Sequence, residues 1–463
     1  MSGSPSVTSQ FVKTLGPSGV FLLTMSALSP VLSVYVGGSA IVQMAGTGAA
    51  VAFIIGGLVA AALSLLFAEL GAAFPRAGGI YPTIAGAMGP AWSYGQMIVV
   101  VVFSPATVAF AAVGVGQYAH FLAPSLGVVA VALGALAVAC GVALLRIRLG
   151  AIVTGLFLGV EMLGLAVLSV IALTHPQHAL ADFILHPVML RAGAIVPTPL
   201  PVLALATVAG ASMASGASWA MCFAEEMQGA QARMGRIIAW IGLLAAIVIV
   251  GPLLLWLAGI RDIAGTMAAE APIAFYLTQT AGPEVATAVG WGVVIAVFNA
   301  LIALVLALSR VLYATGRDGV WPMPINRLLS SLSPRLATPV VATVILGLAS
   351  AGACLLSQRT LVVLTSGDVF TTLMVSLAVY VGRRRGVTGA HFASPWFPLF
   401  PLVGVIFVIG SAWSNVLDKD AGRPSILLLG GVFVSALAYD AWRRRSGDNW
   451  KLAPLIEAED LKS

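Results

Sequence analysis

The fold is decided by a stretch near the N-terminus, residues 26–39, which reads SALSPVLSVYVGGS. It lies within 55 uncharged positions, residues 14–68, enough for two membrane-spanning helices of about 20 residues each. A proline followed by paired glycines leaves backbone carbonyls and amides without partners in the middle of an apolar helix. Inside a membrane such groups are tolerated only where they line a cavity or bind something. The stretch therefore predicts an interrupted helix at a binding site.

The composition places this stretch in a membrane protein. Of 463 residues, 60% are hydrophobic and 9% are charged, whereas soluble domains carry about 25% charged residues. A soluble enzyme, a disordered chain and a secreted disulfide scaffold are therefore excluded. We predict an all-α integral membrane protein with about twelve transmembrane helices. Two are expected in each of residues 14–68 and 77–145, and the others at 150–173, 201–223, 237–260, 283–312, 339–356, 361–381, 395–413 and 425–439.

The basic residues predict how these helices are oriented. With twelve spans, 18 of the 23 lysines and arginines fall on the side of the two termini and five on the other side. Cytoplasmic loops carry an excess of lysine and arginine, so both termini are expected in the cytoplasm and the chain in the plasma (inner) membrane. The formal net charge of +6 is thereby a signal of topology, and nucleic-acid binding is not expected.

A second stretch of the same kind follows at residues 210–219, which read GASMASGASW. Small residues can simply allow close packing of helices, and for either stretch alone this alternative stays open. The pair is more informative, because Gly37 and Gly216 lie 179 residues and five spans apart. Interrupted helices at matching positions of two inverted halves indicate the central site of a transporter.

The broken ends suggest what this site binds. A half-helix offers amide groups to an anion at its start and carbonyls to a cation at its end, so the pair suits a zwitterion such as an amino acid, or an amine. The predicted substrate-binding residues are Ser33, Val34, Tyr35, Gly37, Gly38, Ser39, Ser212, Ser215, Gly216 and Ser218.

One acidic residue lies where a charge is expensive. Glu161 is 11 residues past Gly150, about 16 Å along a helix and close to the centre of the bilayer. A charged side chain there costs about 2.5–3.5 kcal/mol, so the carboxylate is expected to bind and release a proton. We predict a role in proton coupling; the alternative is a protonated structural glutamate. Asp368 in the tenth span is a weaker candidate.

Other chemistry is not indicated by the sequence. The three cysteines have no CxxC spacing and the five histidines fall near predicted loops, so no metal site is expected. No glycine-rich loop ends in Gly-Lys-Ser/Thr, which argues against ATP as the energy source. No enzyme activity and no cofactor are predicted. The oligomeric state is left open.

Two longer motifs resemble those of the amino acid–polyamine–organocation transporters. One is FAELGAAFPRAGGIY at residues 67–81, followed by Gly89-Pro90. The other is SRVLYATGRDGVWP at residues 309–322, followed by Thr338-Pro339. They resemble the family's signature after the second helix and its eighth helix with the exit loop. The resemblance covers residues 17–385.

The resemblance implies a fold and an activity. The fold is a 5+5 inverted repeat (LeuT-like) plus two C-terminal helices, with repeats at about 16–173 and 201–382, helices 11 and 12 within 394–442, and tails at 1–15 and 443–463. The activity is secondary active uptake of an amino acid by symport with protons. A polyamine or organic amine importer, or an amino acid exchanger, is the alternative.

The resemblance also assigns individual roles. Glu161 falls where several relatives carry a lysine in the fifth helix, and the charge is thus reversed. Trp219 and Asn299 are the expected gating residues. The family's Gly-Phe-Glu pattern of the sixth helix stands here as Gly216-Ala217-Ser218.

Overall fold

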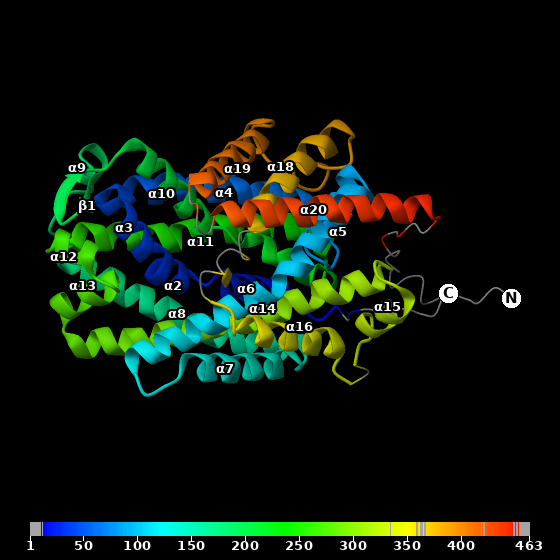
Figure 1. The fold of residues 1–463 in the computed structure, drawn as a ribbon, viewed down its shortest axis with the longest axis horizontal. Helices are drawn as coiled ribbons and strands as arrows, with labels where there is room; N and C mark the ends of the chain where they lie inside the picture. The colour runs from blue at the N-terminus through cyan, green and yellow to red at the C-terminus, as the bar shows by residue number, and fades with distance from the viewer. Residues whose placement is uncertain are drawn as a thin grey trace.

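The structure is a computed structural model that describes residues 11, 13–333, 335–357, 360–361, 364, 367–417, 419, 422–447, 450 and 452. Most of these residues are helical, and many of the helices run along the long axis of the molecule (Figure 1). One end carries the hairpin of β1 (Val188–Arg191) and β2 (Ala194–Pro197), and the opposite end carries α15 (Met323–Leu329). We call these the hairpin end and the α15 end.

The first half of the chain begins with an interrupted helix and continues as long helices. The elements are α1 (Pro17–Leu28), α2 (Pro30–Leu32), the π-helical η1 (Ser33–Gly38), α3 (Ser39–Ala45), the 3₁₀ turn η2 (Gly46–Gly48), α4 (Ala49–Ala73), α5 (Tyr81–Met88), α6 (Pro90–Leu122), α7 (Val128–Ala143), α8 (Ile147–Thr174) and α9 (Leu180–Leu185).

The second half follows the antiparallel hairpin, in which Val188 pairs with Pro197 and Arg191 with Ala194. The elements are α10 (Leu200–Met213), the 3₁₀ segment η3 (Ala217–Glu226), α11 (Ala230–Gly259), α12 (Ile263–Ala268), α13 (Pro272–Ala281), α14 (Pro283–Arg317), α15, α16 (Val340–Ala353), α18 (Gly367–Arg384), α19 (Leu399–Leu417) and α20 (Gly422–Arg445).

Eight helical stretches of the described residues are long and apolar enough to cross a membrane. The first of them, Pro17–Ala73, has 57 residues and is long enough to cross twice. The helices Val128–Ala143 and Val340–Ala353 are also apolar but shorter. The prediction of an all-α integral membrane protein is confirmed, while the number of twelve stays a prediction.

Proline and glycine set many of the helix boundaries. Proline occupies the first position of α1, α6 and α14, where its missing amide is not needed by the helix. Gly89 and Gly282 precede α6 and α14 with positive φ values of 106° and 93°, which glycine adopts without a Cβ clash. Sharp turns thereby separate these long helices from the short helices before them.

Small residues let the helices around the site approach closely. α4 packs against both α10 and α11. At the contact with α10, a Cβ on Gly56 would lie 2.6 Å from the backbone nitrogen of Ala211. α14 crosses the interior and packs on α1, α6 and α8 (Figure 1). The interrupted helices are therefore held between α4, α11 and α14.

Candidate functional site

The first predicted interruption lies at Ser29. This residue has a φ of 47°, its amide donates to the carbonyl of Met25 at 2.9 Å, and its hydroxyl accepts from the amide of Leu32 at 3.4 Å. Pro30 cannot donate a backbone hydrogen bond. The chain therefore ends one helix at Leu28 and starts another at Pro30, in the middle of an otherwise continuous rod.

The paired glycines do not form this break. Gly37 and Gly38 end the π-helical segment η1, and helical backbone continues through them into α3. A Cβ on Gly37 would lie 2.7 Å from the sulfur of Met213, and one on Gly38 would overlap the side chain of Leu253. The two glycines thus serve close packing against α10 and α11.

The carboxylate of Glu161, on α8, lies against the start of α2, the second half of this interrupted helix. The residue is 1% exposed and accepts hydrogen bonds from the Ser29 hydroxyl at 3.1 Å and the Asn299 amide group at 2.8 Å. The Val31 backbone amide interacts with the same carboxylate. Within the described part of the chain Glu161 has no basic partner within 4 Å. The protein's own carboxylate therefore fills the place that we expected for an anionic substrate group on this helix.

Asn299, which we expected to gate the site, lies beside this carboxylate. It is fully buried in α14, and its Nδ2 donates to Glu161 while its Oδ1 has no hydrogen-bond partner among the described residues. In this structure Asn299 is a hydrogen-bond partner of Glu161, and its predicted role in gating stays a prediction. The side chain of Asp368 lies outside the described residues.

The second predicted interruption lies between α10 and η3. α10 ends at Met213, and Gly216 has a φ of 144°, a region that L side chains rarely adopt. A 3₁₀ helix then continues from Ala217. The hydroxyl of Ser33 donates to the carbonyl of Met213 at 2.9 Å, so the end of α10 is tied directly to the first interrupted helix.

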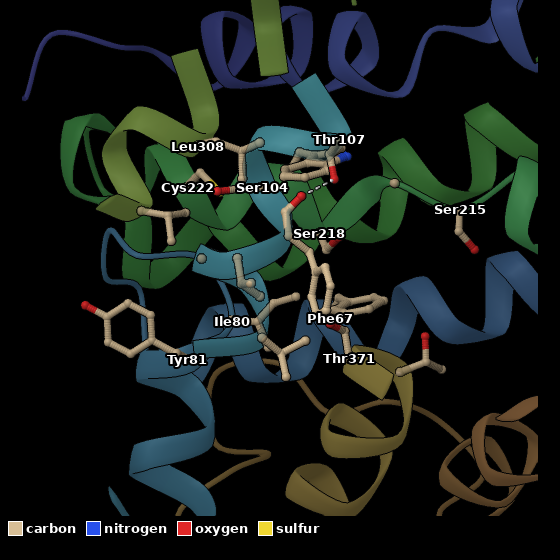
Figure 2. A pocket seen from close by; sticks show the side chains of 18 of the residues that line it. Phe67, Ile80, Tyr81, Ser104, Thr107, Ser215, Ser218, Cys222, Leu308 and Thr371 are labelled. Atoms are coloured by element: carbon tan, nitrogen blue, oxygen red, sulfur yellow. Dashed lines mark hydrogen bonds between the residues drawn. The ribbon is translucent and has the colours of Figure 1, made fainter. Parts of the chain in front are cut away.

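The second interruption opens on a cavity of about 170 Å³. The segment from α10 to η3 contributes six of the residues that line it: Ser212, Ser215, Gly216, Ser218, Trp219 and Cys222. The view in Figure 2 places Ser104, Thr107, Ser218 and Cys222 on one side of this space and Phe67, Ile80 and Thr371 across from them. Most of the lining is apolar, and no charged side chain is among the described residues that form it.

Two hydroxyls at this break are not engaged elsewhere. Ser215 donates to the carbonyl of Ala211 at 2.8 Å. The side chains of Ser212 and Ser218, in contrast, make no hydrogen bond to any described residue. Both line the cavity. Their hydroxyl groups are available as donors and acceptors for a bound molecule.

The predicted residues of the first interrupted helix lie apart from this cavity. Tyr35 and Ser39 line a smaller cavity of about 40 Å³ between α3, α6, α13 and α14. Ser33, Val34, Gly37 and Gly38 line neither of these two cavities. Of the ten predicted substrate residues, four line the larger cavity, two line the smaller one and four line neither.

Several lining residues were not predicted from the sequence. They are hydroxyl-bearing residues within otherwise apolar spans: Ser104 and Thr107 on α6, and Thr371 and Thr372 on α18. Thr371 also accepts a 2.6 Å hydrogen bond from the buried Gln96. The signal that could have identified them is a polar side chain in an apolar run, but such residues are common on helix interfaces.

Ion pairs join η3 to α14 beside the cavity, toward the α15 end. Glu226 of η3 contacts Arg310 of α14 at 2.5 Å, and both side chains are almost completely buried. Glu225 contacts Arg317 at 2.5 Å, and Tyr81, which lines the cavity, donates to Asp318 at 2.7 Å. We call this set, which links η3, α14 and the start of α5, the ion-pair seal.

A separate ion pair, between the partly exposed Arg383 and the buried Glu69, joins α18 to α4. Arg383 donates to both oxygens of Glu69 at 2.6 and 2.8 Å. The same carboxylate accepts from Thr388 and from the amide and hydroxyl of Ser394. Glu69 therefore anchors the loop between α18 and α19, and its ion-pair partner is Arg383.

Comparison with known proteins agrees with this architecture. A family model described as Amino acid permease matches residues 15–435. The chain is 29% identical over 185 residues to the branched-chain amino acid permease BcaP of Lactococcus lactis subsp. cremoris (strain MG1363), a match that covers 39% of this chain and 38% of that protein. It is 29% identical over 135 residues to the methylthioribose transporter of Bacillus subtilis (strain 168), which covers 28% of each.

The chain belongs to the amino acid permease family, within the amino acid–polyamine–organocation superfamily. The resemblance found in the sequence is thereby confirmed. The family model is described as an amino acid permease, and both relatives are named as transporters of small molecules. The matched segments span well under half the length of either relative.

Proposed function

We propose that the protein is a secondary active permease that imports a neutral amino acid together with protons. The observation that supports this most strongly is the cavity at the break between α10 and η3. It offers the free hydroxyls of Ser212 and Ser218 beside the break at Gly216, and its walls are otherwise mainly apolar. Polar groups at one point hold the amino and carboxyl groups, while apolar walls hold an uncharged side chain.

The lining favours an amino acid over a polyamine. A dicationic substrate buried in such a space needs an anionic partner, because an unpaired buried charge is costly. No carboxylate is among the described residues that line the cavity, and Glu161 is not one of them. The name of the branched-chain amino acid permease from Lactococcus lactis agrees with a substrate that carries an aliphatic side chain.

Glu161 is the proposed site of proton coupling. Its surroundings offer hydrogen-bond donors from Ser29 and Asn299 but no cation, and a buried carboxylate without a cation is stabilised by binding a proton. Because Ser29 is the break in the first interrupted helix and Ser33 is bonded to Met213, a change at Glu161 is transmitted to α10 through one short segment.

The transport cycle we propose is alternating access. One helix bundle would rock against a scaffold, within a fold of two inverted repeats at about 16–173 and 201–382, with helices 11 and 12 at about 394–442 added. Both termini would be cytoplasmic in the plasma (inner) membrane. In this orientation the ion-pair seal closes the cytoplasmic side and the cavity of Tyr35 and Ser39 lies toward the outside.

Uptake by purified protein in proteoliposomes tests the proposal. Radiolabelled leucine, isoleucine and valine are compared with putrescine, with and without an inward pH gradient. The proposal predicts gradient-driven accumulation of at least one of these amino acids and no accumulation of putrescine. Putrescine uptake without amino acid uptake would establish the amine importer instead. Amino acid uptake that needs a counter-substrate inside and ignores the gradient would establish an exchanger.

A further inference from the structure

A groove on the outer surface of α20 lies apart from the transport site. Its volume is about 560 Å³, and its walls are one face of α20, the segment between α14 and α15, and part of α6. Leu427 and Gly431 lie on the α20 wall, and Tyr94 and Trp321 lie opposite. No charged side chain is among its described lining residues. The groove is therefore an apolar channel along the side of the helix bundle.

The groove has the length of one membrane leaflet. Leu427 and Tyr439 both line it and are 12 residues apart on α20, which corresponds to about 18 Å. Half of a hydrocarbon core about 30 Å thick is about 15 Å. Leu427 is 75% exposed, as expected for a residue in contact with lipid chains. The groove is therefore long enough to take an acyl chain that lies along α20.

The end of the groove near the α15 end carries aromatic and basic groups. Tyr439 lines the groove, and Trp442 is 61% exposed one turn further along α20; tyrosine and tryptophan are enriched where apolar chains meet headgroups. Arg443 donates to the carbonyl of Val320 in the groove wall at 2.5 Å. Arg445 is exposed and makes no side-chain hydrogen bond or ion pair within the described chain.

The wall opposite α20 is fixed before anything binds. The backbone amide of Trp321 donates to Asn326 Oδ1 at 2.9 Å, and its indole nitrogen donates to Thr315 at 2.8 Å. Because these contacts already hold the wall, a ligand does not have to order it. Preformed sites of this kind lose less free energy to ordering on binding.

We propose that this groove binds one anionic phospholipid, with an acyl chain along α20 and its phosphate at Arg445. Arginine is the side chain best suited to pair with phosphate oxygens. Each buried methylene of the chain adds about 0.8 kcal/mol. The length of the groove matches the acyl chain of such a lipid. Its aromatic border matches the interface region, and the basic end of α20 matches the headgroup.

Two adjacent glycines give a matched test of the chain site. Gly430 and Gly431 both have open space at the Cβ position, so leucine at either position is compatible with the fold, but only Gly431 lines the groove. Purified full-length protein is titrated with phosphatidylglycerol in detergent micelles, and bound lipid is counted by native mass spectrometry. We expect Gly431→Leu to weaken binding about tenfold, the equivalent of about two lost methylenes, and Gly430→Leu to bind like the wild type.

The headgroup site is tested with phosphatidylcholine and with an arginine control. The wild type should retain phosphatidylglycerol in preference to phosphatidylcholine. Arg445→Gln should lower this preference about fivefold, the value of one arginine near an anionic surface, whereas Arg191→Gln on the hairpin should leave it unchanged. Equal binding of the two lipids by the wild type, equal loss in both glycine variants, or blocking of the site by inorganic phosphate alone would overturn the proposal.

Discussion

Glu161 and its neighbours concentrate the proposed coupling chemistry in three residues. Ser29 and Asn299 hold the two carboxylate oxygens and come from segments more than 100 residues away on either side. The sequence identified Glu161 because a carboxylate at mid-membrane depth is costly. It could not assign Asn299 to it, because α8 and α14 meet only through tertiary packing. Hydrogen bonds across such distances leave no pattern in a single sequence.

Replacing Glu161 by glutamine should uncouple transport from the proton gradient. The amide keeps the shape of the protonated acid but cannot release a proton. One pH unit corresponds to about 1.4 kcal/mol per proton, so the wild type should accumulate leucine about tenfold across such a gradient, while Glu161→Gln should only equilibrate it. Uptake into proteoliposomes measures both.

The matched control is Glu284→Gln, which removes an exposed carboxylate from the first turn of α14. It should accumulate leucine like the wild type. Leucine binding by the purified Glu161→Gln protein verifies that this variant is folded. Gradient-driven accumulation by the Glu161→Gln protein would remove Glu161 from the coupling role.

Glu226 and Arg310 form a buried ion pair, and we expect the loss of either residue alone to destabilise the protein more than the loss of both. Arg310 is 0% exposed, and its guanidinium also lies over the rings of Phe11 and Phe223. Removing one partner leaves a buried charge alone, which costs about 3–5 kcal/mol. Glu226→Leu and Arg310→Met should each lower the thermal unfolding midpoint in detergent.

The double variant Glu226→Leu/Arg310→Met should recover most of this loss, because apolar residues of similar volume can replace a buried ion pair. Its unfolding midpoint should therefore lie above those of both single variants. A double variant whose loss equals the sum of the two single losses would mean that the residues act independently.

At the level of elements, the two helices are interrupted by different residues: the first by a proline and the second by a glycine with a positive φ. The proline at position 30 marked the first break within one residue, because proline cannot continue the preceding hydrogen-bond pattern. The paired glycines after it gave the wrong position, since glycine in a membrane helix serves close packing as readily as a break. In the second helix the prediction covered ten residues, and the positive φ of Gly216 identifies the position within them.

Gly216→Ala should test the second break directly. Alanine at a φ of 144° is strained, and a Cβ there would lie 3.0 Å from Leu28. Such backbone strain costs about 1–3 kcal/mol, so the variant should have a lower unfolding midpoint and weaker leucine binding. Gly134→Ala in α7, where the Cβ position is open, should be neutral or stabilising by about 0.5–1 kcal/mol. Wild-type leucine affinity in Gly216→Ala would argue against the break as the binding element.

At the level of the whole molecule, the class of protein could be predicted from the sequence, but the ion pairs between distant segments could not. Apolar spans separated by basic loops are a property of composition, and they predicted an integral membrane transporter. Glu225 and Glu226 are adjacent in the sequence, but their partners Arg317 and Arg310 lie on α14. The packing of η3 against α14 determines that pairing, and only the folded chain contains it.

The central claim is that the cavity beside the second break holds the substrate, and the thiol of Cys222 on its wall reports on it. In a variant with Cys140→Ala and Cys354→Ala, a methanethiosulfonate reagent should modify Cys222 when the ion-pair seal opens. Leucine at ten times its dissociation constant should slow this reaction about tenfold, because only about one site in eleven is then unoccupied. A variant that keeps only Cys140, which lies outside the cavity lining, should show no such protection. Modification of Cys222 at the same rate with and without a transported amino acid would contradict the account.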